Sequence, residues 1–547
     1  MKPNDHAPAG GRAADGETHA IARDAGIVGG ATLLSRVLGL VREQVMASWF
    51  GAGLASDAFN VAFRIPNLLR DLFAEGAMSA AFVPTFTATL QREGRAAAWA
   101  LGRQLLVTLG LVLAIVCVAG GLFAPWLVKV FAPGFGAIDG KLELTVLLTR
   151  VMLPFLPLVA LAAVAMGMLN ALGRFAVPAL APALLNLGMI LGGLALMPVC
   201  GAVGQPAILA MAAGVVIGGL GQFLVQLPSL RAEGFEFRLE WPRAHPGVQR
   251  VARLMAPATI GLAATQFNLF VSTLIASLLP QGSVSWLWYA FRLMQLPIGV
   301  FGVALATVSL PAFSRAAAAG DHRSMARTLS STVRLLMVLT VPAAVWLAAM
   351  SRPVIALLYE HGRFGGADTT ATSGALVLYC IGLPAFAAVG VFTRAFYALG
   401  ETAAPVRASF IAVALNLALN LAFIGPLRRL GLDHMGLALA ASLTSILNLA
   451  QLAFLLRRRL GPIEGGRLVL TLLKVLAASL LAGAFLVWAL WALADRAYGH
   501  WTTELGVVAG GLVIGGAIVW GALRALRVEE LGSLTGMVVP FARRFLR

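Results

Sequence analysis

The fold is decided by a charged motif inside an apolar segment, residues 57–75, which read DAFNVAFRIPNLLRDLFAE. Its ionisable and amide side chains recur every three or four residues, at Asp57, Asn60, Arg64, Asn67, Asp71 and Glu75. This spacing keeps them on one side of a helix. The motif therefore predicts a membrane-spanning helix with one polar face, bent near Pro66 because proline interrupts helical hydrogen bonding.

Part of this motif returns in the second half of the chain. Ala62-Phe63-Arg64 recurs as Ala290-Phe291-Arg292, and Ala171-Leu172-Gly173 recurs as Ala398-Leu399-Gly400. Both pairs are offset by 227 or 228 residues, which independent coincidences would not produce. The offset predicts a parallel duplication, as in transporters whose two lobes surround a central cavity.

The composition excludes a water-soluble globular protein. Of the 547 residues, 59% are hydrophobic and 12% are charged, and the mean hydropathy is +0.86. A soluble protein carries about 25% charged residues. A membrane helix needs about 20 apolar residues. Fourteen apolar segments are long enough, at 26–50, 55–90, 98–127, 143–169, 176–199, 206–229, 252–280, 284–314, 328–350, 370–398, 405–426, 435–456, 467–493 and 504–526.

The predicted fold is therefore an all-α polytopic membrane protein with 14 transmembrane helices. Two pseudo-symmetric six-helix lobes would be followed by two C-terminal helices outside the duplication. We expect the chain to divide into a disordered cytoplasmic tail (1–24), an N-terminal lobe (25–232), a C-terminal lobe (247–458), two additional helices (467–526) and a cytoplasmic C-terminus (527–547).

The charge distribution predicts the orientation. The chain has 41 Lys and Arg against 24 Asp and Glu, a net charge of +17. Basic residues collect in cytoplasmic loops, and here they fall mainly on the side of the N-terminus, so both ends are expected in the cytoplasm. No basic patch interleaved with aromatic residues indicates nucleic acid, and no P-loop indicates ATP. The three cysteines and seven histidines form no metal or disulfide motif.

Charged residues inside the predicted spans are the candidate functional site, since each costs at least about 2.5–3.5 kcal/mol to insert. The first span carries Thr32, Ser35, Arg36, Gly39 and Glu43 along one stripe, with Arg42 at its edge. One interpretation is a set of ion pairs that lock helices together. In that case Glu43 would neutralise Arg36 or Arg42, and Asp57, Asp71 and Glu75 would serve Arg64 or Arg70.

The other interpretation is a cationic cavity for an anionic substrate. Five arginines face four acids in this set, namely Arg36, Arg42, Arg64, Arg70 and Arg292 against Glu43, Asp57, Asp71 and Glu75. Purely structural networks tend to balance, and arginine pairs bidentately with phosphate while staying charged. Asn170, Asn186, Asn416 and Asn420 would either bridge helices, the more common role, or line the cavity.

Several motifs in these segments resemble a known family. They are Ser35-Arg36-Val37-Leu38-Gly39, Asp57-Ala58-Phe59, Phe63-Arg64-Ile65-Pro66-Asn67-Leu68-Leu69-Arg70, Phe73-Ala74-Glu75-Gly76-Ala77, Ala81-Phe82-Val83-Pro84, Gly282-Ser283-Val284-Ser285-Trp286 and Arg292-Leu293-Met294. The chain resembles the MurJ (MviN) family of bacterial lipid II flippases, within the multidrug/oligosaccharidyl-lipid/polysaccharide exporter superfamily. The resemblance covers the chain after the tail.

The resemblance implies specific roles for these residues. Arg36, Arg42, Arg70, Arg292 and Asp57 match positions that bind substrate or line the cationic cavity, while Ser35, Glu43, Arg64, Asn67 and Glu75 are supporting positions. The two C-terminal helices at 467–526 would form a groove for the lipid tail. Three residues depart from the family pattern, namely Glu43 in place of the more usual aspartate, Asp71 after Arg70, and Phe291 before Arg292.

The expected function is the transfer of undecaprenyl-pyrophosphate-linked MurNAc-pentapeptide-GlcNAc from the cytoplasmic to the periplasmic leaflet by alternating access. Neither covalent chemistry nor a cofactor is expected, although a coupling cation or the membrane potential would supply energy. Expected partners are lipid II, membrane lipids and cell-wall synthesis proteins in the bacterial inner membrane.

Other functions of the same or a different class compete with this expectation. A polysaccharide-lipid flippase would share the basic cavity, so the family motifs alone argue against it. A drug antiporter for cations would need an acidic cavity instead. A membrane-embedded glycosyltransferase would need catalytic acids or a metal on a large outer surface, and a membrane scaffold would have no need of buried arginines.

Overall fold

The computed structural model describes residues 10–71, 76–238, 241, 245–429, 431–493 and 501–532. Side chains are described in these ranges except at 10–25, 76–77, 79–80, 256–258 and 260–265. This part of the chain is helical and contains no β-strand. The predicted all-α class is therefore confirmed.

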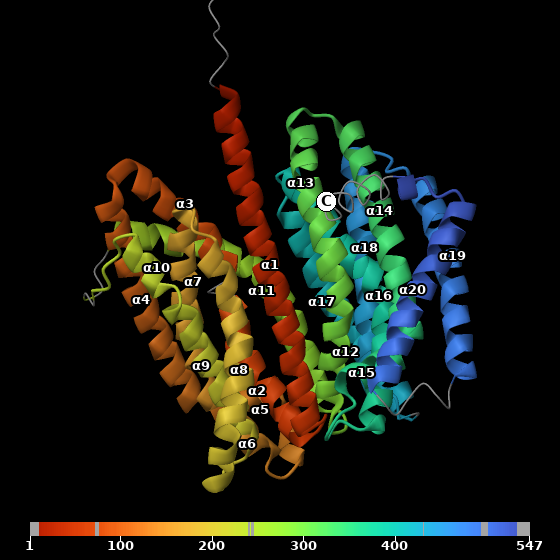
Figure 1. Ribbon diagram of the computed structural model, residues 1–547, viewed down its shortest axis with the longest axis horizontal. Helices are drawn as coiled ribbons and strands as arrows, with labels where there is room; N and C mark the ends of the chain where they lie inside the picture. The colour runs from red at the N-terminus through yellow and green to blue at the C-terminus, as the bar shows by residue number, and fades with distance from the viewer. Residues whose placement is uncertain are drawn as a thin grey trace, which may run out of the picture. The chain divides into compact units, whose positions relative to one another are not determined.

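The helices are, in chain order, α1 (Gly10–Phe50), α2 (Leu54–Arg70), α3 (Gly76–Glu93), α4 (Arg95–Leu122), α5 (Ala124–Phe131), α6 (Lys141–Met152), α7 (Phe155–Ala171), α8 (Ala176–Ala202), α9 (Ile208–Leu224), α10 (Leu227–Ala232), α11 (Pro246–Ser277), α12 (Ser283–Pro297), α13 (Val303–Ala318), α14 (His322–Ala349), α15 (Ser351–Tyr359), α16 (Gly366–Ala398), α17 (Ala403–Arg428), α18 (Asp433–Leu460), α19 (Gly465–Ala492) and α20 (Trp501–Ala525). A short 3-10 turn covers Pro133–Ala137, and a π-helical segment covers Ile298–Gly302. Figure 1 shows their arrangement.

Within the described residues, eleven helical segments are long and apolar enough to cross a membrane. They coincide with eleven of the fourteen segments predicted from the sequence. The other three predicted segments, 26–50, 55–90 and 252–280, are occupied by α1, by α2 with α3, and by α11. The total of fourteen spans stays a prediction, whereas a multi-pass membrane protein is supported.

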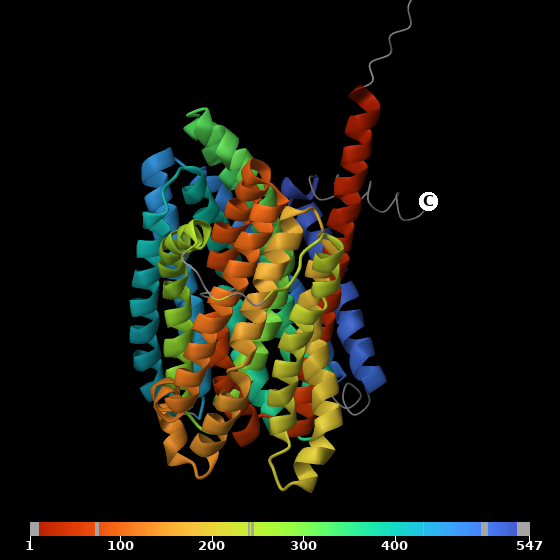
Figure 2. The ribbon, with the colours of Figure 1, turned by 90° about the vertical axis from the view of Figure 1, so that its left-hand side faces the viewer.

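The first helix corrects one expectation about the N-terminus. α1 begins at Gly10, so the predicted disordered tail is wrong for residues 10–24, while residues 1–9 lie outside the described part. Its N-terminal turns extend beyond the other helices of its unit (Figures 1 and 2). Forty-one residues of helix span about 60 Å, roughly twice the thickness of a hydrocarbon core, so the polar first turns lie outside the membrane.

The chain divides into two compact units. Unit 1 comprises residues 1–46, 58–131 and 135–263, and unit 2 comprises 47–57, 132–134 and 264–547. The division falls inside α11 rather than in the loop at 233–246, where the sequence predicts the lobes to separate. The end of α1 and the first turn of α2 also belong to unit 2.

The same helix pairs pack together in each unit, as the duplication predicts. In unit 1, α4 contacts α7, α7 contacts α9, α8 contacts α9, and α3 contacts both α4 and α7. In unit 2, the corresponding contacts are α14 with α16, α16 with α18, α17 with α18, and α13 with α14 and α16. Two sequence segments with the same hydrophobic pattern have therefore formed the same bundle.

Local irregularities repeat as well. Asp71, at the end of α2, is π-helical, and the π segment Ile298–Gly302 lies 228 residues further on. A π turn adds a residue to the helical ring and redirects the side chains after it. The two segments predicted to be bent, 55–90 and 284–314, thus have a π turn at equivalent positions. The bend was predicted near Pro66, but α2 continues as a helix through that residue.

The loop after α7 and the loop after α16 form the same turn. Gly173 and Gly400 both have φ of 74°. The next N–H, of Arg174 or Glu401, donates to a carbonyl five residues back, Leu169 or Phe396, at 2.9 and 3.0 Å. These bonds satisfy carbonyls that the helix end leaves open. The repeated Ala-Leu-Gly motif therefore encodes a helix stop.

Helices α8 and α9 pack with their backbones close together. A Cβ added to Gly214 would lie 2.7 Å from the Gly188 oxygen, and one added to Gly218 would lie 2.7 Å from the Leu185 Cα. Small residues spaced four apart allow this approach, which drives association of membrane helices through van der Waals contact. The α8–α9 pair forms one wall of unit 1 (Figure 2).

The two C-terminal helices pack on unit 2. α19 contacts α14 and α20, and α20 also contacts α15. Arg334 of α14 donates to Glu530 at 2.5 Å and to Glu464 at 3.1 Å, and it is largely buried. This cluster connects the start of α19 and the segment after α20 to α14, and no sequence motif predicts it.

We expect Gly214→Ala to lower the thermal midpoint of the purified protein. The added methyl group meets backbone rather than a flexible side chain, and overpacking of this kind costs about 1–3 kcal/mol. Gly221→Ala is the matched control on the same helix, because its Cβ would lie 3.7 Å from Leu184, an ordinary contact. Thermal unfolding in detergent measures both; equal midpoints would contradict the packing argument.

Candidate functional site

The polar stripe of α1 contacts α8 at the amide side chain of Asn186. Asn186 of α8 accepts a hydrogen bond from Arg42 Nη1 at 3.0 Å and donates one to the Ser35 carbonyl at 3.0 Å. Gly39 leaves room for this side chain, since its Cβ position is 3.6 Å from Asn186 Nδ2. Asn186 therefore bridges two helices, which is the more common of the two roles predicted for it.

Arg42 and Glu43 are both buried and form an ion pair. Together with Asn186, Glu43 satisfies guanidinium donors that would otherwise face an apolar interior. The ion-pair interpretation thus holds for Arg42. Glu43 was predicted to neutralise either Arg36 or Arg42, and the structure pairs it with Arg42.

Arg36 differs from Arg42 although the two lie on the same helix. Its side chain is exposed, and it has no hydrogen bond or ion pair among the residues that the structure describes. It lies on a segment with exposed apolar neighbours, Leu33, Leu34 and Val37. The positive charge of Arg36 therefore lies among exposed apolar side chains of α1, with exposed Thr32 one turn before it.

The charged residues of α2 have mixed surroundings. Arg70 pairs with Asp71, with Nη2 and Nε at 2.8 and 3.1 Å from Oδ1. Asp71 is thus one partner of Arg70, and Arg70 has a further interaction as well. Arg64 is half-buried and has an interaction of its own, and the buried Oδ1 of Asn67 has no hydrogen-bond partner in the described part. Glu75 lies outside the described residues.

Asp57, predicted as a substrate-binding residue, caps a helix in the structure, and its substrate role stays a prediction. In unit 2 its Oδ2 accepts from the Gly282 N–H at 2.8 Å, and its Oδ1 accepts from the Ser285 N–H at 3.0 Å and the Ser285 hydroxyl at 2.7 Å. The carboxylate, 1% exposed, therefore caps the N-terminus of α12, where free N–H groups and the helix dipole favour negative charge.

Gly282 is required for this cap. Its φ is 97°, and a Cβ there would lie 2.7 Å from the Trp286 ring and 2.9 Å from the Ala52 carbonyl. Asp57 and Ser285 are also 228 residues apart, the offset of the duplication. Two equivalent positions of the repeat therefore bond directly to each other.

Arg292 lies on α12, seven residues after Ser285, and its side chain is half-buried with an interaction of its own. The preceding Phe291 packs edge-on against Tyr379, with ring centroids 5.5 Å apart. The unusual aromatic residue before Arg292 therefore anchors α12 on α16. The predicted site residues are thus divided, with Asp57 and Arg292 in unit 2 and the others that are described in unit 1.

Other polar residues bridge helices within unit 2. Asn420 donates to Asn416 at 2.9 Å, and Asn416 donates to Thr444 at 3.4 Å, which joins α17 to α18. Within the described residues, no group of three or more His, Cys, Asp and Glu side chains is arranged to hold a metal ion.

Comparison with known proteins decides the family. The family model described as "Lipid II flippase MurJ" matches residues 46–505, most of the chain. The chain belongs to the MurJ family. The resemblance carried by the motifs in the first two spans is thus confirmed.

Curated relatives and solved structures agree with this assignment. The chain is 38% identical over 438 residues to a "Probable lipid II flippase MurJ" of Vibrio cholerae, covering 78% of this chain and 81% of that protein. It is 38% identical over 436 residues to the "Lipid II flippase MurJ" of Burkholderia cenocepacia, covering 79% and 83%.

A solved MurJ structure in an inward closed conformation superposes with a TM-score of 0.73 at 26% identity, covering 92% of this chain and 99% of that one. An inward-facing multidrug transporter of the MATE family superposes with a TM-score of 0.66 at 13% identity, covering 79% of this chain and 96% of that one. At that identity, the second likeness shows the shared fold alone.

We expect Asp57→Ala and Ser285→Ala each to lower the thermal midpoint, because loss of a cap costs about 1 kcal/mol and a charged hydrogen bond about 1.5–3 kcal/mol. Since they remove the same interaction, the double variant should lose less than the sum of the two. Ser309→Ala is the control, because its hydroxyl bonds within its own helix. Additive losses for Asp57 with Ser285 would contradict the cap.

Proposed function

We propose that this MurJ-family protein moves lipid II from the cytoplasmic to the periplasmic leaflet of the bacterial inner membrane, with both chain termini in the cytoplasm. The observation that carries the proposal is the exposed guanidinium of Arg36, which has no partner in the described part of a chain of the lipid II flippase family. A pyrophosphate is an anion that arginine pairs with bidentately. No covalent step is required.

In this proposal Arg36 makes the first contact with the diphosphate. Arg42, Arg70 and Arg292 are further phosphate contacts, with Arg64 in support. The Oδ1 of Asn67, which accepts no hydrogen bond in the described part of the chain, suits a hydroxyl or amide of the sugar-peptide head group. Ser35 and Glu43 hold α1 and Arg42 in place.

The ion pairs of Arg42 and Arg70 fit a site that is empty for part of its cycle. A buried arginine without a counter-ion is strongly unfavourable, so a neighbouring carboxylate stabilises it until an anion arrives. Glu43 and Asp71 each directly follow the arginine they pair with. A phosphate that displaces the carboxylate would exchange one charged partner for another at little net cost.

Alternating access requires parts of the fold that change shape. We assign this role to the segments around the π-helical turns at Asp71 and Ile298–Gly302, which mark the ends of α2 and α12. Single π turns are frequent at functional bends. The Asp57 cap fixes the opposite end of α12, so α12 would pivot about its capped end.

The isoprenoid tail would stay in lipid along the two C-terminal helices. α19 and α20 carry exposed apolar side chains such as Leu473, Leu481, Leu512 and Val513, which suit a hydrocarbon partner. The Arg334 cluster would hold this pair in place while the head group crosses.

The membrane potential is the simplest energy source. Moving an anionic head group outward from a negative interior is favourable by about 2.3 kcal/mol per charge per 100 mV. A coupling cation would add to this, and cell-wall synthesis proteins would supply and consume the lipid.

We expect Arg36→Ala and Arg292→Ala to reduce lipid II flipping at least about tenfold, because each removes a charge-assisted hydrogen bond to phosphate. The measurement is rescue of peptidoglycan synthesis in depleted cells, with abundance in the membrane checked by immunoblot. Arg238→Ala is the control, since Arg238 is 69% exposed and paired only with its neighbour Glu236 in the described part. Lipid II flipping by Arg36→Ala at the native rate would contradict a role for Arg36 in binding phosphate.

A second experiment separates the structural from the functional role of Arg42. The double variant Arg42→Gln with Glu43→Gln replaces a buried ion pair by neutral groups that still hydrogen-bond, which is often neutral for stability. We expect it to fold with a near-native thermal midpoint and to flip poorly. A well-folded double variant that supports growth would mean that Arg42 only locks α1 to α8.

A further inference from the structure

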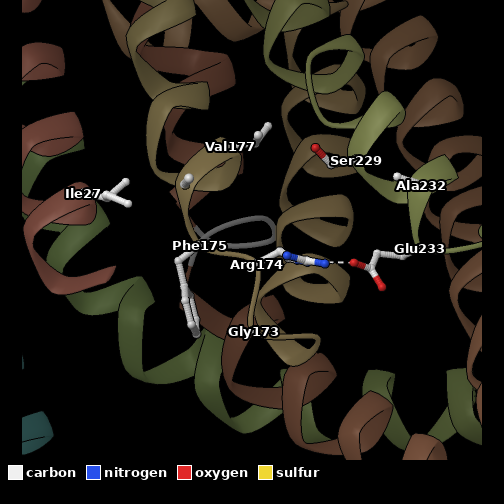
Figure 3. A pocket seen from close by; sticks show the side chains of 9 residues that line it. Ile27, Gly173, Arg174, Phe175, Val177, Ser229, Ala232 and Glu233 are labelled. Atoms are coloured by element: carbon white, nitrogen blue, oxygen red, sulfur yellow. Dashed lines mark hydrogen bonds and ion pairs between the residues drawn. The ribbon is translucent and has the colours of Figure 1, made fainter. Parts of the chain in front are cut away.

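Unit 1 contains a pocket apart from the arginines discussed above. It has a volume of about 320 Å³ and is lined by Ile27, Gly173, Arg174, Phe175, Ala176, Val177, Ser229, Ala232 and Glu233. Figure 3 shows Ile27 of α1 on one side, the loop into α8 below, and the end of α10 opposite. One face of α1, the start of α8 and the end of α10 therefore form one open, partly apolar pocket.

The rim of this pocket carries a surplus of positive charge. Arg174 Nε lies 2.7 Å from Glu233 Oε1, and Arg95 Nη2 lies 3.7 Å from Glu233 Oε2. Two guanidinium groups thus share one carboxylate, for a local charge of +1. Arg174 is 66% exposed and uses its Nε in this pair, so its terminal nitrogens have no partner among the described residues and can donate to a ligand.

The pocket also holds an unused hydroxyl and apolar walls. Ser229 lines it, and its hydroxyl has no hydrogen bond among the described residues. Ile27 and Phe175 are about 40% exposed and place apolar surface beside the charged rim. A ligand that matches this pocket carries an anionic head and an apolar body.

The equivalent turn in unit 2, at Gly400 and Glu401, shows whether the fold itself requires an arginine at this position. Glu401 occupies the position of Arg174 there, and it pairs with Arg459 at 3.1 Å. Both copies therefore have an ion pair between this loop and a nearby helix end. In unit 1 the loop supplies the basic residue, whereas in unit 2 the loop supplies the acidic one. Since the fold accepts either direction, the fold alone does not require an arginine at position 174.

We propose that this pocket binds the head group of an anionic glycerophospholipid in the leaflet that the N-terminus faces. The phosphodiester accepts hydrogen bonds from the terminal nitrogens of Arg174 and from Ser229, and the acyl chains lie along Ile27 and Phe175. Basic clusters at a membrane surface attract anionic lipids by about 1 kcal/mol per arginine.

This site is distinct from the proposed flipping site on α1. Ile27 and Arg36 are nine residues apart, two and a half turns at 3.6 residues per turn, so they project from opposite sides of the helix. A lipid held at Ile27 would stabilise the face of α1 that Arg36 does not use. The inference therefore does not depend on the identity of the transported lipid.

The test measures lipid binding to the purified full-length protein by native mass spectrometry, with phosphatidylglycerol and phosphatidylcholine as probes. Arg174→Ala should bind phosphatidylglycerol about fivefold more weakly, the loss of one charge. Glu233→Gln should bind it about fivefold more tightly, because both guanidinium groups lose their competing carboxylate. Arg238→Ala, in a matched exposed ion pair outside the pocket, should bind as the native protein does.

The opposite signs of the two variants make the test decisive. Damage to the fold would weaken binding in both, whereas the proposal predicts a loss in one and a gain in the other. Equal binding of the two phospholipids by the native protein, or no change in Arg174→Ala, would overturn the proposal. Displacement of phosphatidylglycerol by millimolar inorganic phosphate would also overturn it, because the acyl chains would then contribute nothing.

Discussion

The structure depends on how its apolar helices compensate the charges they carry. A carboxylate or guanidinium inside a bilayer is tolerated only with a partner or a water-filled surrounding. The Asp57 carboxylate is well compensated, because three donors at the start of α12 hydrogen-bond to it. Arg42 and Arg70 have adjacent carboxylates, whereas Arg36 has no partner among the residues that the structure describes. This difference is the reason that we propose Arg36, rather than Asp57, as the first contact for an anionic ligand.

The duplication explains why these charges occur where they do. Each copy supplies a long segment broken by a π turn, a helix stop at Ala-Leu-Gly, and the same set of packed helix pairs. Against this common frame the copies differ in chemistry. Asp57 corresponds to Ser285, and Arg174 corresponds to Glu401. At this position one copy carries a carboxylate and the other carries the serine that donates hydrogen bonds to it.

Much of this arrangement follows from the sequence, for physical reasons. Hydropathy and length predict the helices, and the repeat offset predicts the equivalent packing of the two halves. The bridge by Asn186 and the Arg42–Glu43 pair were each one of two predicted alternatives, because few other partners exist in an apolar span. The cap formed by Asp57 was not, since a contact between residues 228 apart depends on tertiary structure. The helix at residues 10–24 was also missed, because a polar composition argues against burial but not against extension of an existing helix.

The central claim is that an uncompensated cationic surface in this fold grips a diphosphate so that a lipid-linked precursor can cross the membrane. It is tested most directly by depleting the protein in its host and measuring how much lipid II reaches the outer leaflet with a leaflet-specific assay. The account predicts that lipid II accumulates in the inner leaflet and that its outward appearance stops. Unchanged appearance of lipid II in the outer leaflet would contradict it.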